Sequence, residues 1–313
     1  MAAKRTIDIS MPNLAFPERL TIELTNDCNL VCTMCPRMEM SKNLGYMDVE
    51  LYKKIIDEAS RYTAQTPITL VPFFRGESLM HPNFFEMIEL AKRAGLKPIQ
   101  LTTNAMLLTE ELSNKLIRAE IDFISFSVDV LGEEAYKRVR LGGDYKLVMS
   151  NIDKFLEMRV ALGSKLPEVQ VSTVETEENT ESLSEFIDYW QEKVDRVRVY
   201  PEHSTDGSFG SLTGYELPIF DKRLPCRKVF TDMVVYWNGD VAVCNHDWGR
   251  KEFIGNVKDN TLAEIWTGDK YKEIRTRHMA GTLDDDPTCA HCDHWKMYYT
   301  DEGRIGKLIK KGA

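Results

Sequence analysis

The sequence has little of what would place this protein in a membrane or on nucleic acid. No stretch of its 313 residues approaches an apolar membrane span, and the opening residues MAAKRTIDIS lack the hydrophobic core of a signal peptide. The net charge is −9 and no long basic run occurs, which gives little support for binding a phosphate backbone. Internal repeats and low-complexity segments are missing as well. We therefore predict a cytoplasmic globular protein that binds neither membrane nor nucleic acid.

Cysteine is scarce, and its distribution is uneven. Of only seven cysteines, Cys28, Cys32 and Cys35 crowd into a C-x3-C-x2-C pattern. An odd number of thiols cannot close as disulfides, and clustered cysteines in a reducing compartment more often bind metal. Thiolates suit iron–sulfur, zinc or copper(I), and ligand softness alone does not choose among these. Three thiolates leave one coordination position open, where something else can bind.

The pattern from Leu20 to Tyr200 alternates apolar runs with amphipathic segments. It predicts six strands, at 20–24, 68–74, 98–103, 121–128, 168–174 and 197–200. Helical patterns lie between them, at 49–62 after an Asp48 N-cap, 83–95 ending on Gly95, 109–119, 145–161 and 181–194. This order is typical of an α/β protein with parallel strands, either a partial (β/α)6 TIM-like barrel or an open sheet. Ligand chemistry then belongs at the carboxyl ends of the strands, where the cysteine cluster lies.

A second region follows a Gly- and Ser-rich linker. We expect a β-hairpin at 229–244 with an Asn238-Gly239 turn, and one helix at 261–277. The predicted division of the chain is an N-terminal extension (1–19), a core domain (20–200), a linker (201–225), a small iron–sulfur domain built from a β-hairpin and a helix (226–300) and a frayed basic tail (301–313). The remaining cysteines all fall in the fourth segment, at Cys226, Cys244, Cys289 and Cys292.

The C-x3-C-x2-C pattern after the first strand of an α/β repeat resembles the radical S-adenosylmethionine (SAM) superfamily. The resemblance implies that Cys28, Cys32 and Cys35 ligate a [4Fe–4S] cluster whose unique iron binds SAM. Reductive cleavage of SAM then yields a 5′-deoxyadenosyl radical that abstracts hydrogen from a substrate. Met34 stands where the family usually has an aromatic residue and is a candidate cofactor contact. A mononuclear zinc site completed by a distant histidine is the alternative.

Further motifs extend the resemblance through the core domain. Arg75-Gly76-Glu77-Ser78 is similar to the family's Gly-Gly-Glu-Pro, with the first Gly and the Pro replaced. Gly76 would let the backbone approach the cofactor, and Glu77 would accept hydrogen bonds from its ammonium group. By the same resemblance Asn104 and Ser127 are candidates for ribose contacts, Arg140 for the cofactor carboxylate, and Val174 for a cofactor contact. Each of these taken alone also fits an ordinary loop or cap residue.

The second region resembles the auxiliary-cluster extension called SPASM, in its shortened Twitch form. The shared features are Gly239 followed five residues later by Cys244, and the closing Cys289-x-x-Cys292. With Cys226, these cysteines would fully ligate a second [4Fe–4S] cluster, for which electron transfer is the natural role. His246, His291 and His294 flank them as candidate hydrogen-bond donors near sulfur. A zinc ribbon with four cysteine ligands is the alternative.

The second region is also similar to that of aminocyclitol dehydrogenases, such as 2-deoxy-scyllo-inosamine dehydrogenase, in natural product biosynthesis. We therefore expect a radical SAM oxidoreductase that converts a sugar or aminocyclitol alcohol to a ketone and receives electrons from flavodoxin or ferredoxin. Glu202 and His203, just past the sixth strand, are candidates to handle a proton, or are simply solvated loop residues.

Three other functions stay open beside dehydrogenation. Three plus four ligands account for all seven cysteines, so no thiol is left to donate hydrogen in an epimerisation. Only about twenty residues precede the first strand, too few for a leader-binding domain of the kind that peptide-modifying relatives often carry. A small-molecule substrate is therefore favoured over an epimerase or a peptide-modifying enzyme. A non-catalytic zinc-binding scaffold is the remaining alternative.

Overall fold

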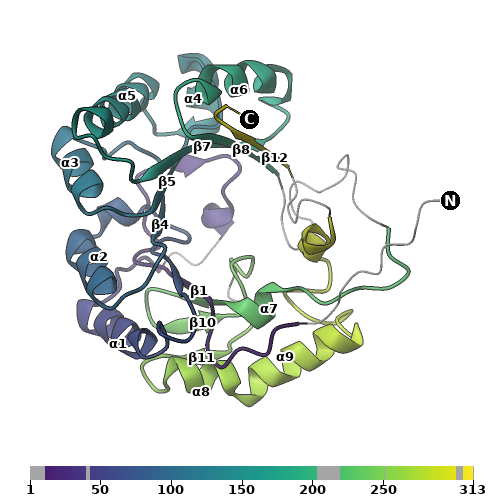
Figure 1. The fold of residues 1–313 in the computed structure, drawn as a ribbon. Coiled ribbons are helices and arrows are strands. Elements are labelled where there is room, and N and C mark those ends of the chain that lie inside the picture. The colour runs from purple at the N-terminus through teal and green to yellow at the C-terminus, as the bar shows by residue number, and fades with distance from the viewer. Residues whose placement is uncertain (1–10, 40–42, 203–218, 250, 301–305, 313) are drawn as a thin grey trace.

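The six predicted strands are present, and they run parallel in sequence order. The computed structural model describes residues 11–39, 43–202, 219–249, 251–300 and 306–312. Its parallel strands are β1 (Arg19–Ile22), β3 (Thr69–Val71), β4 (Gln100–Thr103), β5 (Phe123–Ser127), β7 (Glu168–Glu175) and β8 (Arg196–Pro201). A parallel bridge from Leu70 to Ile99 links β3 to β4. The strands curve into an open barrel, which confirms the predicted partial (β/α)6 fold (Figure 1).

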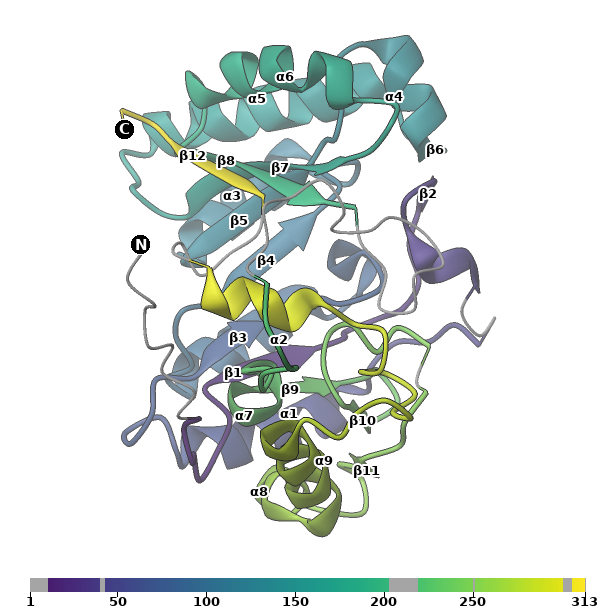
Figure 2. The same ribbon diagram turned by 90° about the vertical axis from the view of Figure 1, so that its right-hand side faces the viewer.

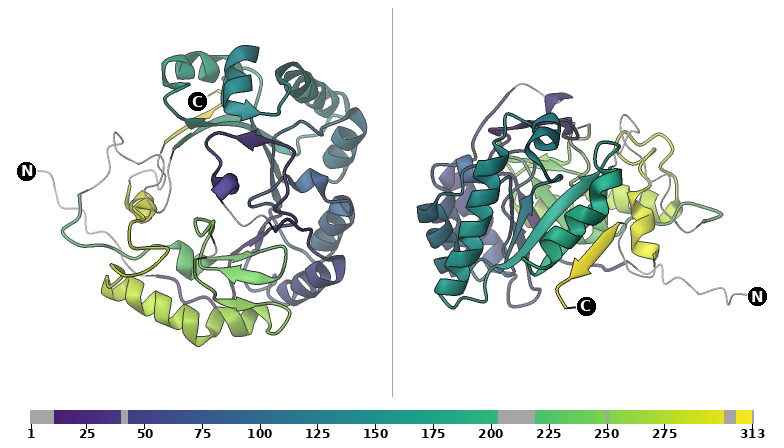
Figure 3. Two further views of the ribbon diagram at one scale, coloured as in Figure 1. Left: turned by 180° about the vertical axis from the view of Figure 1, so that it is seen from behind. Right: turned by 90° about the horizontal axis from the view of Figure 1, so that it is seen from above.

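The predicted helices cover the outside of this barrel (Figure 3). They are α1 (Val49–Ser60), α2 (Phe84–Arg93), α3 (Glu110–Arg118), α5 (Tyr145–Ala161) and α6 (Leu183–Gln191), with α4 (Glu133–Val139) as an unpredicted addition. The Asp48 side chain caps α1 by accepting from the backbone N–H groups of Glu50 and Leu51. Apolar side chains of strands and helices form one continuous core, because alternate strand residues such as Leu20 and Ile22 face the helices.

The second region continues the barrel sheet. It comprises α7 (Lys228–Thr231), β9 (Asp232–Val235), β10 (Asp240–Ala242), β11 (Gly255–Asn256), α8 (Leu262–Thr267) and α9 (Asp269–Ala280). The β9–β10 hairpin forms as predicted, and Gly239 has the positive φ of 90° that its turn requires. Strand β9 pairs in parallel with β1, so the sheet order is β11-β10-β9-β1-β3. Figure 2 shows α8 and α9 on the same side of the barrel as α1.

Two expectations about the second region and the tail are wrong. The helix predicted over 261–277 is broken at Gly268, whose backbone is extended and separates α8 from α9. A Cβ at Gly268 would lie 2.8 Å from the Glu264 carbonyl oxygen, so only glycine fits this close approach. The tail predicted to fray instead forms β12 (Lys307–Lys310), antiparallel to β8. It covers the hydrogen-bonding edge that β8 would otherwise expose.

Short elements complete the chain. They are β2 (Val31–Cys32), β6 (Arg140–Leu141) and the 3-10 helices η1 (Pro36–Glu39), η2 (Ser78–Met80), η3 (Thr180–Ser182) and η4 (His294–Tyr299). Strands β2 and β6 pair with each other and carry predicted site residues. Across the part of the chain that is described, no helix is both long and apolar enough to cross a membrane.

Candidate functional site

The three clustered cysteines lie on one excursion of the chain beyond the carboxyl end of β1. Cys28 is in the loop, Cys32 is in β2 and Cys35 follows in a turn closed by a 3.1 Å bond from its N–H to the Cys32 carbonyl. All three thiols are half-buried, and burial is the main cause that raises their pKa values, that of Cys28 to about 11. Such thiols stay protonated at neutral pH unless a bound metal displaces the proton.

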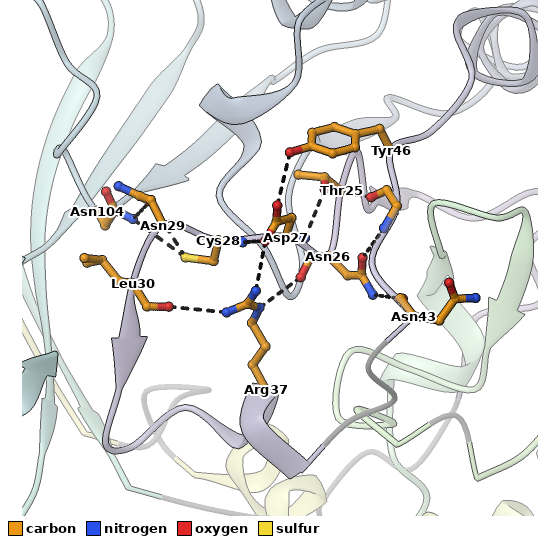
Figure 4. Close-up of polar contacts among 11 residues, drawn as sticks. Thr25, Asn26, Asp27, Cys28, Asn29, Leu30, Arg37, Asn43, Tyr46 and Asn104 are labelled. Carbon is orange, nitrogen blue, oxygen red and sulfur yellow. Dashed lines mark hydrogen bonds and ion pairs between the residues drawn. The ribbon is translucent and has the colours of Figure 1, made fainter. Parts of the chain in front are cut away.

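Arg37 holds the loop that carries Cys28 (Figure 4). Its guanidinium donates to the carbonyl oxygens of Asn26 at 3.0 Å and Leu30 at 3.3 Å. It also forms an ion pair with the Asp27 carboxylate at 3.1 Å, and that carboxylate accepts the Cys28 N–H at 2.8 Å. One planar side chain therefore fixes the backbone on both sides of Cys28. Arg37 was missed at the sequence level, although its position two residues after Cys35 was a usable signal.

Gly76 is needed because two segments of backbone meet there. A Cβ on this residue would lie 2.3 Å from the Asp27 carbonyl oxygen and 2.4 Å from that of Thr25, which no side chain allows. The neighbouring Glu77 N–H donates to the same Asp27 carbonyl at 2.8 Å. The side of Gly76 on which a Cβ would project thus faces the Cys28 loop. The Gly-Glu motif therefore packs directly on the loop that carries the first cysteine.

Glu77 is a buried carboxylate to which the described residues supply three hydrogen-bond donors. It accepts from the Leu79 N–H at 3.2 Å, the Thr103 hydroxyl at 2.9 Å and the Asn104 N–H at 2.8 Å. Burial raises its pKa, while these hydrogen bonds and the charge of Arg140 oppose the shift. A carboxylate offers about four lone-pair sites. The predicted cofactor contact would therefore use a further site of a side chain that already joins the ends of β3 and β4.

Asn104 reaches toward the cysteine loop. Its Nδ2 donates to the Asn29 side chain at 2.8 Å and lies 3.8 Å from the Cys28 sulfur, while its Oδ1 accepts the Met106 N–H at 3.0 Å. Figure 4 shows this amide beside Cys28. Asn104 therefore sits at the first cysteine in this structure, and the ribose contact suggested for it stays a prediction.

Arg140 and Val174 meet at one buried carboxylate that the sequence did not reveal. Asp129 holds a left-handed backbone conformation with φ of 68° just beyond β5. Its Oδ2 accepts from Arg140 Nε at 2.5 Å, and its Oδ1 accepts the Val174 N–H at 2.8 Å. Arg140 is also the β-pairing partner of Cys32. Asp129 thus links the ends of β5 and β7 to the second cysteine.

The other predicted residues lie around this end of the barrel. Ser127 ends β5 and is half-buried, and half-buried Met34 packs against the hydrophobic core. Glu202 follows β8 and is half-buried; burial and then the nearby Glu178 and Glu177 raise its pKa. His203 lies outside the described residues.

The structure brings the other four cysteines together. Cys226, Cys244, Cys289 and Cys292 all line one cavity. Burial is the main cause that raises their thiol pKa values, that of Cys226 to about 12. Four soft sulfur donors in a cavity that the cationic residues Arg223 and Lys228 also line suit an anionic iron–sulfur cluster. Among the described residues, no three His, Cys, Asp or Glu side chains are arranged to hold a single metal ion.

Three histidines, His246, His278 and His294, line the same cavity. His246 and His294, which the sequence suggested, have ring centroids 4.1 Å apart, whereas His291 is exposed. His278 was missed because it lies in α9, away from every cysteine in sequence. Its Nδ1 is 3.2 Å from the Cys226 backbone nitrogen and its Nε2 is 3.6 Å from the Cys289 sulfur. Burial and the charge of Arg223 lower its pKa to about 4.

A buried ion pair joins the Gly-Glu motif to the second region. Arg75, which replaces the first Gly of the Gly-Gly-Glu-Pro motif, binds the Glu23 carboxylate through two bonds of 2.5 and 2.8 Å. The third nitrogen of its guanidinium donates to the Trp248 carbonyl at 3.1 Å, and the Arg75 Cζ atom lies 4.2 Å from the Tyr236 ring centroid. Tyr236 and Trp248 belong to the hairpin region that carries Cys244. Arg75, which departs from the family motif, therefore contacts the second region.

Comparison with known proteins agrees with these two sites. The model of the radical SAM superfamily matches residues 22–188, and the SPASM iron–sulfur cluster-binding domain matches residues 226–293. A tungsten-containing aldehyde ferredoxin oxidoreductase cofactor-modifying protein of Pyrococcus furiosus is 29% identical over 301 residues, 82% of each chain. A probable GTP 3′,8-cyclase of Methanocaldococcus jannaschii is 34% identical over 140 residues, 44% of this chain and 45% of that protein.

Solved structures share the fold at low identity. BtrN in complex with AdoMet and 2-DOIA superposes with a TM-score of 0.59 at 18% identity, over 89% of this chain and 93% of BtrN. SuiB of Streptococcus suis bound to S-adenosylmethionine gives 0.69 at 17% identity, over 94% of this chain and 77% of SuiB. The predicted cofactors, SAM and two [4Fe–4S] clusters, are those that the two matched domains imply. With more than half of its length matched by the family model, the chain belongs to the radical SAM superfamily and carries a SPASM domain.

Proposed function

We propose that this radical SAM enzyme oxidises a small molecule and that its seven cysteines hold two [4Fe–4S] clusters. Cys28, Cys32 and Cys35 would hold the SAM-binding cluster, and Cys226, Cys244, Cys289 and Cys292 the auxiliary one. The observation that carries the proposal is the meeting of four thiols on one cavity, two of them buried and two half-buried, which leaves no cysteine over. A cluster with four thiolate ligands has no open iron for substrate, so its natural role is electron transfer.

The two clusters would divide the chemistry between them. When bound by Cys28, Cys32 and Cys35, the first cluster would supply the electron for reductive cleavage of SAM, and the second, held by Cys226, Cys244, Cys289 and Cys292, would accept the electron that substrate oxidation releases. A secondary alcohol that gives up one hydrogen atom, one proton and one electron becomes a ketone. Flavodoxin or ferredoxin would supply and remove electrons.

Several side chains of this chain have proposed tasks in that reaction. Glu77 would direct a further acceptor position at the SAM ammonium group, and Arg37 and Asn104 would hold the Cys28 loop in place. Glu202 would take the substrate proton, because its raised pKa brings a carboxylate toward the range of a general base. Ser127, Arg140 and Val174 remain candidates for cofactor contacts.

The experiment compares SAM cleavage with substrate oxidation. Wild-type protein reconstituted without oxygen should bind about eight irons per chain and form one deoxyadenosine for each oxidised sugar or aminocyclitol. The double variant Cys289→Ala/Cys292→Ala should keep about four irons and still cleave SAM, but form no ketone. A matched variant, Cys28→Ala/Cys32→Ala, should lose SAM cleavage itself. An inverted carbon in place of a carbonyl, or ketone formation without the second cluster, would overturn the proposal.

A second candidate function is the modification of another enzyme's cofactor. It is favoured by the Pyrococcus furiosus relative, which matches 82% of this chain at 29% identity, whereas the BtrN likeness at 18% speaks for the fold alone. The substrate would then be a metal-binding organic cofactor. The test measures deoxyadenosine formation in parallel reactions, one with cyclitols and one with the cofactor extracted from a tungsten aldehyde oxidoreductase. The substrate that stimulates deoxyadenosine formation distinguishes the two candidate functions. If deoxyadenosine forms only with the extracted cofactor, modification of that cofactor would replace alcohol oxidation as the proposed function.

A further inference from the structure

His278 touches two cysteines of the auxiliary cavity at once. It lies in α9, 1% exposed, and its ring spans from the backbone of Cys226 to the side chain of Cys289. The Nδ1 is 3.2 Å from the Cys226 backbone nitrogen, and the Nε2 is 3.6 Å from the Cys289 sulfur. These cysteines are far apart in the sequence. One buried side chain therefore contacts two proposed ligands of the same cluster.

The geometry fixes which ring nitrogen carries the proton. A backbone N–H can only donate, so the Nδ1 that faces Cys226 must accept and carries no hydrogen. A neutral imidazole has one ring proton, which must then be on Nε2. That N–H points to the Cys289 sulfur at a separation suited to a hydrogen bond to sulfur. The backbone of one ligand thus turns His278 into a donor to another.

We propose that His278 is a positioning residue that raises the reduction potential of the auxiliary cluster through a hydrogen bond to the Cys289 thiolate. The inference rests on the proposed four-cysteine cluster and deepens its role. Reduction adds negative charge to the cluster and its sulfurs, so a donor to sulfur stabilises the reduced form more than the oxidised form. A raised potential makes the cluster a better acceptor for the electron that substrate oxidation releases.

Two substitutions separate the donor from the acceptor of this ring. In His278→Gln the terminal amide nitrogen replaces Nε2 and can still donate to Cys289, whereas the contact with Cys226 is lost. In His278→Asn the side-chain oxygen replaces Nδ1 and can still accept from Cys226, whereas Cys289 loses its donor. Both variants are polar and smaller than histidine. A merely structural role therefore predicts similar potentials for the two.

The test is a redox titration of the full-length reconstituted protein with SAM bound, followed by electron paramagnetic resonance. At the wild-type midpoint of the auxiliary cluster, the reduced-to-oxidised ratio in His278→Asn should fall about tenfold, equivalent to about 59 mV for one electron. His278→Gln should stay near the wild-type ratio. An unchanged midpoint in His278→Asn, or an equal shift in both variants, overturns the inference.

Two further readouts keep this result separate from the proposed function. About four irons per wild-type chain and no second signal would refute the auxiliary cluster itself, whatever the variants do. In wild-type protein with ¹⁵N-labelled histidine, the reduced auxiliary cluster should show a nitrogen hyperfine coupling that disappears in His278→Asn. This measurement also serves if a variant does not fold, because a wild-type spectrum without the coupling overturns the hydrogen bond directly.

Discussion

Replacing Arg75 by Met should destabilise the protein far more than removing an exposed arginine. The side chain of Glu23 has no solvent exposure and that of Arg75 only 3%, so Arg75→Met leaves a buried carboxylate without its cation. Breaking one side of a buried pair costs about 3–5 kcal/mol. With an unfolding entropy of about 2.1 cal/mol/K per residue, this corresponds to roughly 5–8 °C for a chain of 313 residues. The ring contact with Tyr236 adds to the loss.

Thermal and urea unfolding of the reconstituted protein measure this effect. Arg93→Met is the matched control, because the ion pair of Arg93 with Glu89 is two-thirds exposed on both sides and should contribute less than about 1 kcal/mol. The double variant Glu23→Gln/Arg75→Met should recover part of the stability, since it leaves no buried charge. If Arg75→Met and Arg93→Met shift the midpoint equally, the buried pair does not join the two regions as argued.

Three more outcomes are expected. Arg37→Ala should weaken iron loading of the cluster at Cys28 by about tenfold, as residues that orient metal ligands do, measured as iron bound at limiting supply; unchanged loading contradicts the clamp. Burial, followed by the charge of Asp286, raises the pKa of Glu252 to about 7 from an ordinary 4.5. The contribution of Glu252 to folding stability is therefore complete below pH 4.5 and is lost as the pH rises through 7. Glu252→Gln should therefore be more stable than wild type at pH 8, by about 1–2 kcal/mol after solvent screening, and equal to it near pH 4; urea midpoints at the two pH values decide. Glu58 accepts hydrogen bonds from the first two N–H groups of α8 at 2.8 and 2.9 Å. Glu58→Gln should therefore lower the free energy of unfolding by about 1.5–3 kcal/mol. A urea midpoint equal to that of wild type would contradict this prediction.

The barrel could be predicted from the sequence because its signals are local. The core strands fall in short apolar runs, and the helices between them follow amphipathic patterns. Three of these helices begin after a side-chain N-cap, at Asp48, Thr109 and Asp144. The tail was mispredicted for the opposite reason. Half of the residues in strand β12 are lysines, and the strand forms by pairing with the edge of β8. Its own residues give no signal of this distant partner. The Gly268 break likewise depends on a close approach to Glu264 that periodicity does not show.

The same division between local and distant signals holds for the site. The spacing of Cys28, Cys32 and Cys35 and the Gly76-Glu77 pair stand in short motifs, so they could be found without a structure. Asp129 and His278 could not, because their partners Val174 and Cys226 lie far away in the sequence and no short motif contains either pair. The structure also gives a reason for Gly76 that its motif did not reveal, while the expected approach of its backbone to the cofactor stays a prediction. Its missing side chain makes room for the Cys28 loop.

The parallel pairing of β9 with β1 means that the SPASM region cannot be cut away cleanly. A shortened chain ending in the linker would strip the hydrogen-bonding partner from Arg19–Ile22, the strand that leads into the Cys28 loop. Its bare edge would be open to pairing with other chains. Anyone seeking a minimal catalytic fragment, or grafting this auxiliary region onto another barrel, should treat the two parts as one folding unit and move the first strand together with the hairpin.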